Sequence, residues 1–402
     1  MKKSAILILA TMIFASQNLA SEFIEALRGG EKGGDINLLF DYTRQPSAPK
    51  NRAYLATSFG LYYKSAFYEY FRLHLGFRGA LALWELNKKT QNPGGRGDSA
   101  RDFWNKNIAM VARSYLEYFD GDTSVRAGRI EHKTDMIDRH FDGVWISNKS
   151  AGWLLIDAIY INQVGRVLDR EMSGFEKFKR FDGSTSKYGG GYYLGLDFEV
   201  KEWLHLKIYG LTSPQIYSFI AGKASVESEY FNASTGYVGG IEHQHSKFTN
   251  QANNSHFSHL VHIDVGGQYD SQYGLFHATL GYRNTQGKAG IGSLDFTGNS
   301  FNPFFYFSGD ALHYAKDLQL VYGKLGFKVD FLDVYLMYGY NFFKGDFSRI
   351  GNANNTQGEV NFYFDWKFSD FSSVVLWVLN THGAESSIPN KTNVGLMFKV
   401  SL

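Results

Sequence analysis

The sequence predicts an all-β protein, namely a transmembrane antiparallel β-barrel of 18 strands, with 16 as the alternative count. Residues 70–84 show the pattern most clearly, because apolar side chains recur at every second position and Arg72, His74 and Arg78 stand between them. Successive side chains of a strand point to opposite faces. This stretch therefore has one hydrocarbon face and one cationic face.

A barrel in a membrane satisfies both faces, since lipid covers the apolar side and water fills the inside. A soluble protein would need helices or a second sheet over the apolar face, and the sequence largely lacks such helices. A soluble β-sandwich, propeller or solenoid is the alternative. No repeat of fixed length supports the last two, and the aromatic ladders exceed what one sheet interface could bury.

The composition restricts the class of function. The 402 residues include no Cys, 26 Tyr and 34 Phe, and the formal charge is +2. A nucleic-acid-binding protein should show a basic excess, so no nucleic-acid partner is expected. The absence of Cys excludes disulfides and thiolate metal sites, and the aromatic content suits the girdles of a barrel at two membrane interfaces.

The first 20 residues read as an export signal. Lys2 and Lys3 precede the apolar run 5–15, and Asn-Leu-Ala at 18–20 precedes a plausible cleavage site. An anchoring helix is the alternative, but the run falls short of the roughly 20 residues that a span requires. We expect residues 21–402 to form the barrel in the bacterial outer membrane.

Amphipathic strands follow in order, and about 16 can be assigned directly. The clearest cover residues 36–43, 54–63, 70–84, 108–119, 123–131, 194–200, 204–208, 261–269, 276–282, 334–342, 360–368 and 394–402. Residues 211–257 and 284–316 are long enough to hold another pair. Short turns alternate with long polar loops such as 85–101, so we expect periplasmic turns and extracellular loops. The last segment is itself amphipathic, as barrel closure requires.

Three short motifs suggest a family. They are Val-Arg-Ala-Gly-Arg at 125–129 with Asp135, Asp138, Arg139 and Phe-Asp-Gly-Val at 141–144; Tyr-Leu-Gly-Leu-Asp-Phe at 193–198 with Leu-His-Leu at 204–206 and Pro-Gln-Ile-Tyr at 214–217; and Leu-Gly-Tyr-Arg at 280–283 with Gly287. In this order they resemble the OprD-type outer-membrane channels, including relatives in Helicobacter and Campylobacter. The resemblance implies 18 strands and a third loop, here residues 132–141, that folds inward and narrows the pore. It also implies a basic ladder along one wall, acidic residues opposite it, and small solutes with a carboxylate, such as amino acids or organic acids.

Basic side chains on the water-facing side could select such solutes, because a row of weak cationic sites lets an anion enter and leave. The candidates are Arg72, Arg78, Arg113, Arg126, Arg129, Lys207 and Arg283. The alternative for each is that it only pairs with a lumen carboxylate such as Glu117, Asp197 or Asp264. Arg126 and Arg129 are three positions apart, so they share a face only if the strand has a bulge.

In the third loop, Asp135, Asp138 and Arg139 are candidates for the constriction. The two aspartates could instead accept hydrogen bonds from backbone donors in a turn. Five histidines between 243 and 262 could gather a divalent metal, with a solvated loop as the alternative. We expect neither a metal nor a cofactor.

The sequence favours a passive channel for small hydrophilic solutes, embedded in outer-membrane lipid as a monomer or homotrimer. An enzyme is not expected, because no nucleophile elbow, metal-ligand helix or phosphate loop accompanies the Ser and His residues. The alternative function is a non-conducting barrel that acts as an adhesin or a structural protein through its long loops.

Overall fold

The computed structural model describes residues 22–46, 50–87, 97–101, 109–135, 137–177, 189–214, 216–243, 256–287, 304, 316–344, 354–383 and 390–402. The predicted export signal lies outside these residues. Residues 22–28 form a short helix and Asp98–Arg101 a 3-10 turn (η2). In the described part of the chain no helix is both long and apolar enough to cross a bilayer.

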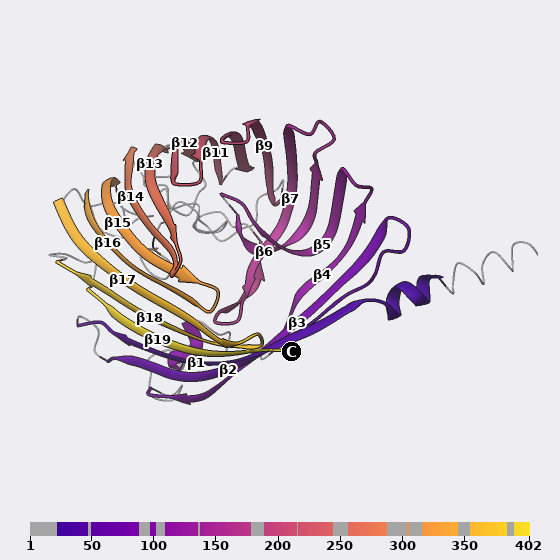
Figure 1. The fold of residues 1–402 in the computed structure, drawn as a ribbon, viewed down its shortest axis with the longest axis horizontal. Helices are drawn as coiled ribbons and strands as arrows, with labels where there is room; N and C mark the ends of the chain where they lie inside the picture. The colour runs from indigo at the N-terminus through magenta and orange to yellow at the C-terminus, as the bar shows by residue number, and fades with distance from the viewer. Residues whose placement is uncertain are drawn as a thin grey trace, which may run out of the picture.

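The strands form one antiparallel sheet that closes into a barrel (Figure 1). Its wall has the predicted 18 strands: β1 (Glu31–Arg44), β2 (Arg52–Lys64), β3 (Phe71–Glu85), β4 (Ala109–Phe119), β5 (Thr123–Lys133), β6 (Asp138–Asn148), β7 (Leu154–Val167), β9 (Gly191–Lys201), β10 (Leu204–Ser213), β11 (Tyr217–Glu227), β12 (Phe231–Glu242), β13 (His256–Ser271), β14 (Gly274–Gly287), β15 (Lys316–Val329), β16 (Leu332–Lys344), β17 (Asn354–Ser369), β18 (Ser372–His382) and β19 (Thr392–Ser401). The short β8 (Met172–Glu176) pairs only with β7. Closure comes from β1 and β19, whose register places Ile36 opposite Val400.

Short turns join the strands at the end of the barrel where β1 begins and β19 ends, and the longer connections lie at the other end. The extra pair expected within residues 211–257 is β11 and β12. The first strand begins at Glu31, ahead of the predicted 36–43, because Gly33 and Gly34 still pair with β2. Their lack of side chains hid them from a search for alternating polarity.

The outer face of the barrel is apolar. Ile220 and Leu280 have 64% and 71% of their surface exposed, and neither is covered by a further protein layer. The neighbouring positions on these strands turn polar side chains such as Lys223 and Arg283 inward. Lipid is the solvent that makes such an outer face stable, so the alternation predicted from the sequence corresponds to a membrane-facing side and a lumen side.

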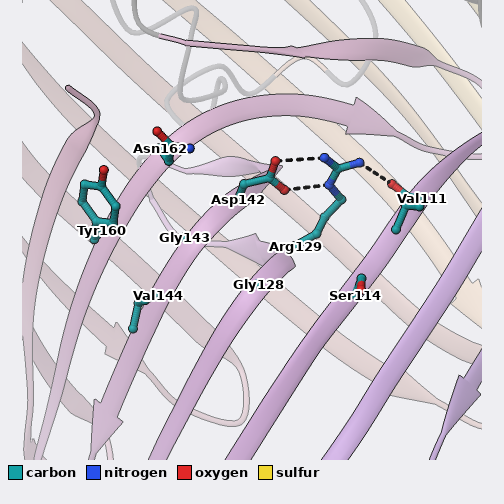
Figure 2. Close-up of a pocket in the computed structure, with 9 residues that line it drawn as sticks. All are labelled: Val111, Ser114, Gly128, Arg129, Asp142, Gly143, Val144, Tyr160 and Asn162. Carbon is teal, nitrogen blue, oxygen red and sulfur yellow. Dashed lines mark hydrogen bonds and ion pairs between the residues drawn. The ribbon is translucent and has the colours of Figure 1, made fainter.

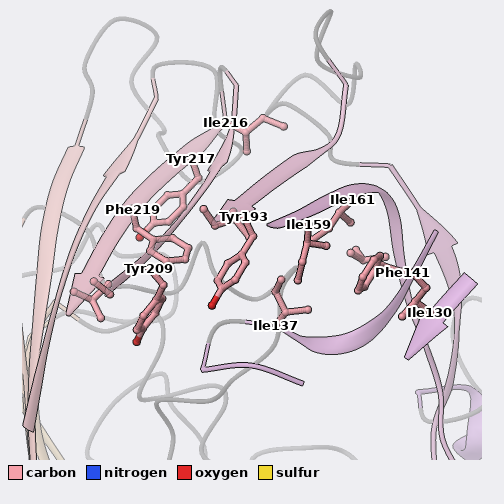
Figure 3. Close-up of a cluster of buried hydrophobic side chains, with 14 of the residues drawn as sticks. Ile130, Ile137, Phe141, Ile159, Ile161, Tyr193, Tyr209, Ile216, Tyr217 and Phe219 are labelled. Atoms are coloured by element: carbon pink, nitrogen blue, oxygen red, sulfur yellow. The ribbon is translucent and has the colours of Figure 1, made fainter. Parts of the chain in front are cut away.

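The buried apolar side chains lie inside the barrel, in three clusters. In the largest, Ile130, Ile137 and Phe141 meet Tyr193 and Tyr209 of the wall (Figure 3). A second contains Met172 of β8, and a third contains Phe304. The first two clusters therefore join the wall to hairpins that fold into the lumen, and in the third Phe304 packs against the wall.

Candidate solute pathway

The β5–β6 hairpin leaves the wall at Gly128. The ladder between β4 and β5 stops at the pair Ser114 and Arg129, although both strands continue beyond it. Gly128 has φ +131°, and a Cβ there would lie 2.2 Å from the carbonyl oxygen of Ser114. Only glycine accepts this backbone conformation and this close approach without strain. The hairpin consequently bends away from β4 and into the lumen (Figure 1).

The tip of this hairpin contains the predicted constriction segment, residues 132–141. The backbone N–H of Thr134 donates to the carbonyl of Ile137 at 2.6 Å, which closes the turn, and Ile137 is fully buried against the wall. The carboxylate of Asp135 lies 3.1 Å from Lys207 Nζ on β10 and 3.4 Å from Lys223 Nζ on β11. The tip is thus held against strands far from its own root.

The charge of Asp135 is maintained by these two lysines. Burial alone would raise the pKa of the carboxyl, but the ammonium groups of Lys207 and Lys223 outweigh burial and hold the pKa below its ordinary value. The other two residues proposed for the constriction lie at the start of β6. Asp138 is the backbone partner of Lys133 on β5, and Arg139 is the backbone partner of His132.

A second hairpin, formed by the end of β7 and by β8, accompanies the first. β7 separates from β9 beyond the pair Ile161 and Gly191, while Val164 and Gly165 remain paired with β6. Four strand ends therefore cross the lumen as one small sheet. We refer to these ends, residues 129–133, 138–142, 162–167 and 172–176, as the partition.

The tip of the second hairpin reaches the far wall. Asp169 Oδ2 lies 2.7 Å from Lys399 Nζ on β19, and the hydroxyl of Ser58 on β2 donates to the Asp169 carbonyl at 2.6 Å. Met172 is buried beside Leu39 and Met397. Burial raises the pKa of the Asp169 carboxyl, but the charge and hydrogen bond of Lys399 lower it further, so the pKa lies below the ordinary value.

The alternation of polar and apolar residues does not predict this second hairpin. The available signals were the 14-residue length of β7 and the charged tripeptide Asp169-Arg170-Glu171 between two apolar runs. Charged turn residues between such runs are typical of a hairpin. Nothing in the local sequence indicates that the hairpin points inward, because that direction is set by contacts with β2 and β19.

Each of the seven cations proposed to line the pore has a carboxylate partner. The ion pairs are Arg72 with Glu117, Arg78 with Asp35, Arg113 with Glu131, Arg126 with Glu117, Arg129 with Asp142, Lys207 with Asp135 and Arg283 with Asp264. The structure therefore contains both features that the sequence left open, cations on the lumen side and pairing with carboxylates, except that Arg129 does not face the lumen.

The pairing is not one to one. Glu117 is shared by Arg72 and Arg126, and it also accepts a hydrogen bond from Ser124. Asp135 is shared by Lys207 and Lys223. In each of these two clusters two permanent cations share one carboxylate.

The seven cations differ in their access to water. The Arg113 side chain is 45% exposed, a larger fraction than for any of the other six. The Arg283 side chain is 8% exposed and donates two 2.7 Å hydrogen bonds to Asp264. Arg126 lies over the Trp145 ring on the lumen face of β5. Arg129 lies three positions further along an unbroken register, on the other face.

No group of His, Cys, Asp and Glu side chains in the described residues is arranged to hold a metal ion. In the His-rich segment, Nε2 of His243 and the hydroxyl of Ser218 share a hydrogen bond of 2.9 Å. His262 lies on the lumen face of β13 beside Asp264. His245 lies outside the described residues.

The geometry defines a membrane barrel whose interior is crossed by two hairpins and carries two clusters in which two cations share one carboxylate. Neither protein-family models nor curated sequences give a significant match to the chain. Solved structures do match. OccAB4 of Acinetobacter baumannii superposes with a TM-score of 0.73 at 12% identity, covering 93% of this chain and 98% of OccAB4.

Two structures from Pseudomonas aeruginosa are similarly close. OpdO has a TM-score of 0.72 at 11% identity, covering 94% of this chain and 99% of its own. OpdK, solved with vanillate, has a TM-score of 0.69 at 13% identity, covering 92% and 98%. The fold of this chain is thus that of the OprD-family outer-membrane porins of Gram-negative bacteria. A closer relation to Helicobacter and Campylobacter proteins stays a prediction.

Proposed function

We propose that the protein is a passive channel of the outer membrane for small hydrophilic solutes, with a preference for solutes that bear a carboxylate. The observation that carries the proposal is that two cations share one carboxylate in each of two clusters, Arg72 with Arg126 around Glu117 and Lys207 with Lys223 around Asp135. They lie on different parts of the lumen wall. A dissolved carboxylate between them is attracted from both sides.

Weak and multiple sites suit transport. Because the clusters already contain carboxylates, a solute carboxylate competes for donors that are partly satisfied, and its binding stays weak enough for release. Arginine offers forked donors that match a carboxylate, and Arg113 is the most exposed of them. The structure of OpdK with vanillate, an aromatic carboxylate, supports the same solute class in a barrel of this fold.

The partition would set the size of the passing solute. Asp135 at its tip faces Lys207 and Lys223, so the same contact that fixes the hairpin also shapes the charge of the narrowed region. We propose the roles of Asp138 and Arg139 as parts of this constriction from their place in the same hairpin.

Planar-bilayer recording of the purified protein tests the proposal. We expect discrete conductance steps that small carboxylates reduce, and a reversal potential that favours anions in a salt gradient. Lys223→Met with Arg72→Met removes one positive charge from each cluster, and one charge is worth roughly 1 kcal/mol at about 4 Å in water. The anion-to-cation permeability ratio should fall about fivefold or more. Lys344→Met, which removes an exposed lysine at the loop end of β16, is the matched control.

A non-conducting adhesin or structural barrel is the second candidate. The specific observation in its favour is that apolar clusters fill part of the lumen beside both hairpins. The same recordings separate the two functions. Stable insertion without conductance steps would favour the adhesin, and an unchanged reversal potential in the double variant would remove the two clusters from the selectivity argument.

A further inference from the structure

The departure of the β5–β6 hairpin leaves a notch in the outer face of the wall, between β4 and β7. The notch has a volume of about 670 Å³ and is lined by Val111, Ser114, Arg129, Asp142, Val144 and Tyr160 together with nearby backbone (Figure 2). Cavities of this size hold small organic ligands. The sequence pattern does not predict the notch, because the notch forms only where a hairpin leaves the wall.

The notch opens on the membrane side. Val144 and Tyr160 are cross-strand partners, and two positions away on β6 Ile146, on the same face, is 44% exposed to lipid. Val111 and Ser114 lie opposite Phe77 and Leu75, which belong to the apolar face of β3. These four lining side chains, Val111, Ser114, Val144 and Tyr160, therefore face away from the lumen.

A charged pair sits in this membrane-facing notch. Arg129 donates from Nε and Nη2 to the two carboxylate oxygens of Asp142, at 2.7 and 2.9 Å, and from Nη1 to the carbonyl of Val111 at 3.0 Å. The Phe175 ring stacks on the guanidinium with its centroid 3.5 Å from Cζ. Arginine has five N–H donors, so two remain after these three bonds.

An ionic group with unused donors is costly against pure hydrocarbon. The depth of the Arg129–Asp142 pair in the membrane lowers this cost. Tyr160 contacts Tyr192, and such tyrosines mark the level where acyl chains give way to polar head groups. We propose that the notch binds one membrane lipid, with phosphate or ester oxygens accepting from Arg129 and an acyl chain against Val111, Val144 and Tyr160. The lipid completes the wall where β5 and β6 have left it.

Native mass spectrometry of the intact protein tests this with one defined probe at a time, either dipalmitoyl phosphatidylglycerol or purified lipid A. We expect one lipid that survives detergent removal, and the two probes distinguish a phospholipid from lipid A as the source. Val144→Trp fills the notch and should reduce occupancy about tenfold, equivalent to roughly 1.4 kcal/mol. Ile146→Trp places the same ring on the same face outside the notch and should leave occupancy unchanged.

Asn162→Trp, which fills the notch from β7, provides a second variant if Val144→Trp does not fold. Equal lipid retention by the wild type and a folded notch-filling variant would overturn the proposal. So would a wild-type protein that retains neither probe. Because the readout is lipid mass, these outcomes do not depend on whether the barrel conducts.

Discussion

Lys399 Nζ on the last strand lies 2.7 Å from Asp169 Oδ2 at the tip of a hairpin that starts on another part of the wall. This ion pair, the Ser58 hydrogen bond and the burial of Met172 hold the hairpin across the lumen. Removing the ion pair should therefore loosen the partition without unfolding the barrel.

Asp169→Asn should increase current fluctuations in the open state, because the hairpin tip then loses its ion pair with β19 while the Ser58 hydrogen bond and the Met172 contact remain. Single-channel recording at neutral pH measures the effect. Asp317→Asn removes an exposed ion pair with Lys344 at the loop end and serves as the control. Equal noise in the two variants would show that the Lys399 contact does not restrain the hairpin.

The pH dependence of the partition follows from Asp135 and Asp169. Both carboxyl groups have a pKa below the ordinary value of 3.8, so their ion pairs stabilise the folded partition above that value and are lost as the pH falls through the lowered pKa. We expect similar open-state noise at pH 7 and 5 and a rise only below about pH 4. Noise that already rises between pH 7 and 5 would contradict this assignment.

Gly128→Ala should destabilise the bend that sends β5 into the lumen. An alanine must adopt φ near +131° with its Cβ only 2.2 Å from the Ser114 carbonyl oxygen, which we expect to cost on the order of 1–3 kcal/mol. Unfolding in urea, followed by tryptophan fluorescence in detergent, gives the difference. Gly323→Ala is the control, because a Cβ there meets only the Leu280 side chain at 3.5 Å.

Ile220→Arg tests which face of the wall meets lipid. A cation on the lipid face costs up to about 2–4 kcal/mol, depending on depth. The variant should fold less completely into vesicles than Ser225→Arg, which lies on the same strand and on the face that carries Lys223. If both variants fold equally well, the outer face of β11 is not in contact with hydrocarbon.

The wall could be predicted because every strand must alternate between side chains that face lipid and side chains that face water. Alternation along residues 70–84 placed Arg72 and Arg78 on the lumen side, and their partners Glu117 and Asp35 lie there too. Met110 shows where this reasoning fails. Strict alternation along residues 108–119 would turn Met110 outward like Leu116, but Ala112 is an extra residue opposite the bond between Gly76 and Phe77, and this bulge turns Met110 toward the interior.

The partition and the notch were harder to foresee. A bulge or an inward bend depends on a single position such as Gly128, and the surrounding residues keep the same polarity pattern. The partners that hold the hairpin tips, Lys223 for Asp135 and Lys399 for Asp169, are distant in sequence. Contacts of this kind become visible only when the strands are placed around the ring.

The seam between β1 and β19 has a consequence for assembly. Asn393 donates to the Asp41 carboxylate at 2.9 Å across this seam, although 352 positions separate the two residues. Joining segments so distant in sequence carries a large loss of chain entropy, and β1 and β19 each keep an unpaired edge until they meet. Lys399 belongs to that same strand, so the anchor of the β7–β8 hairpin arrives together with the seam.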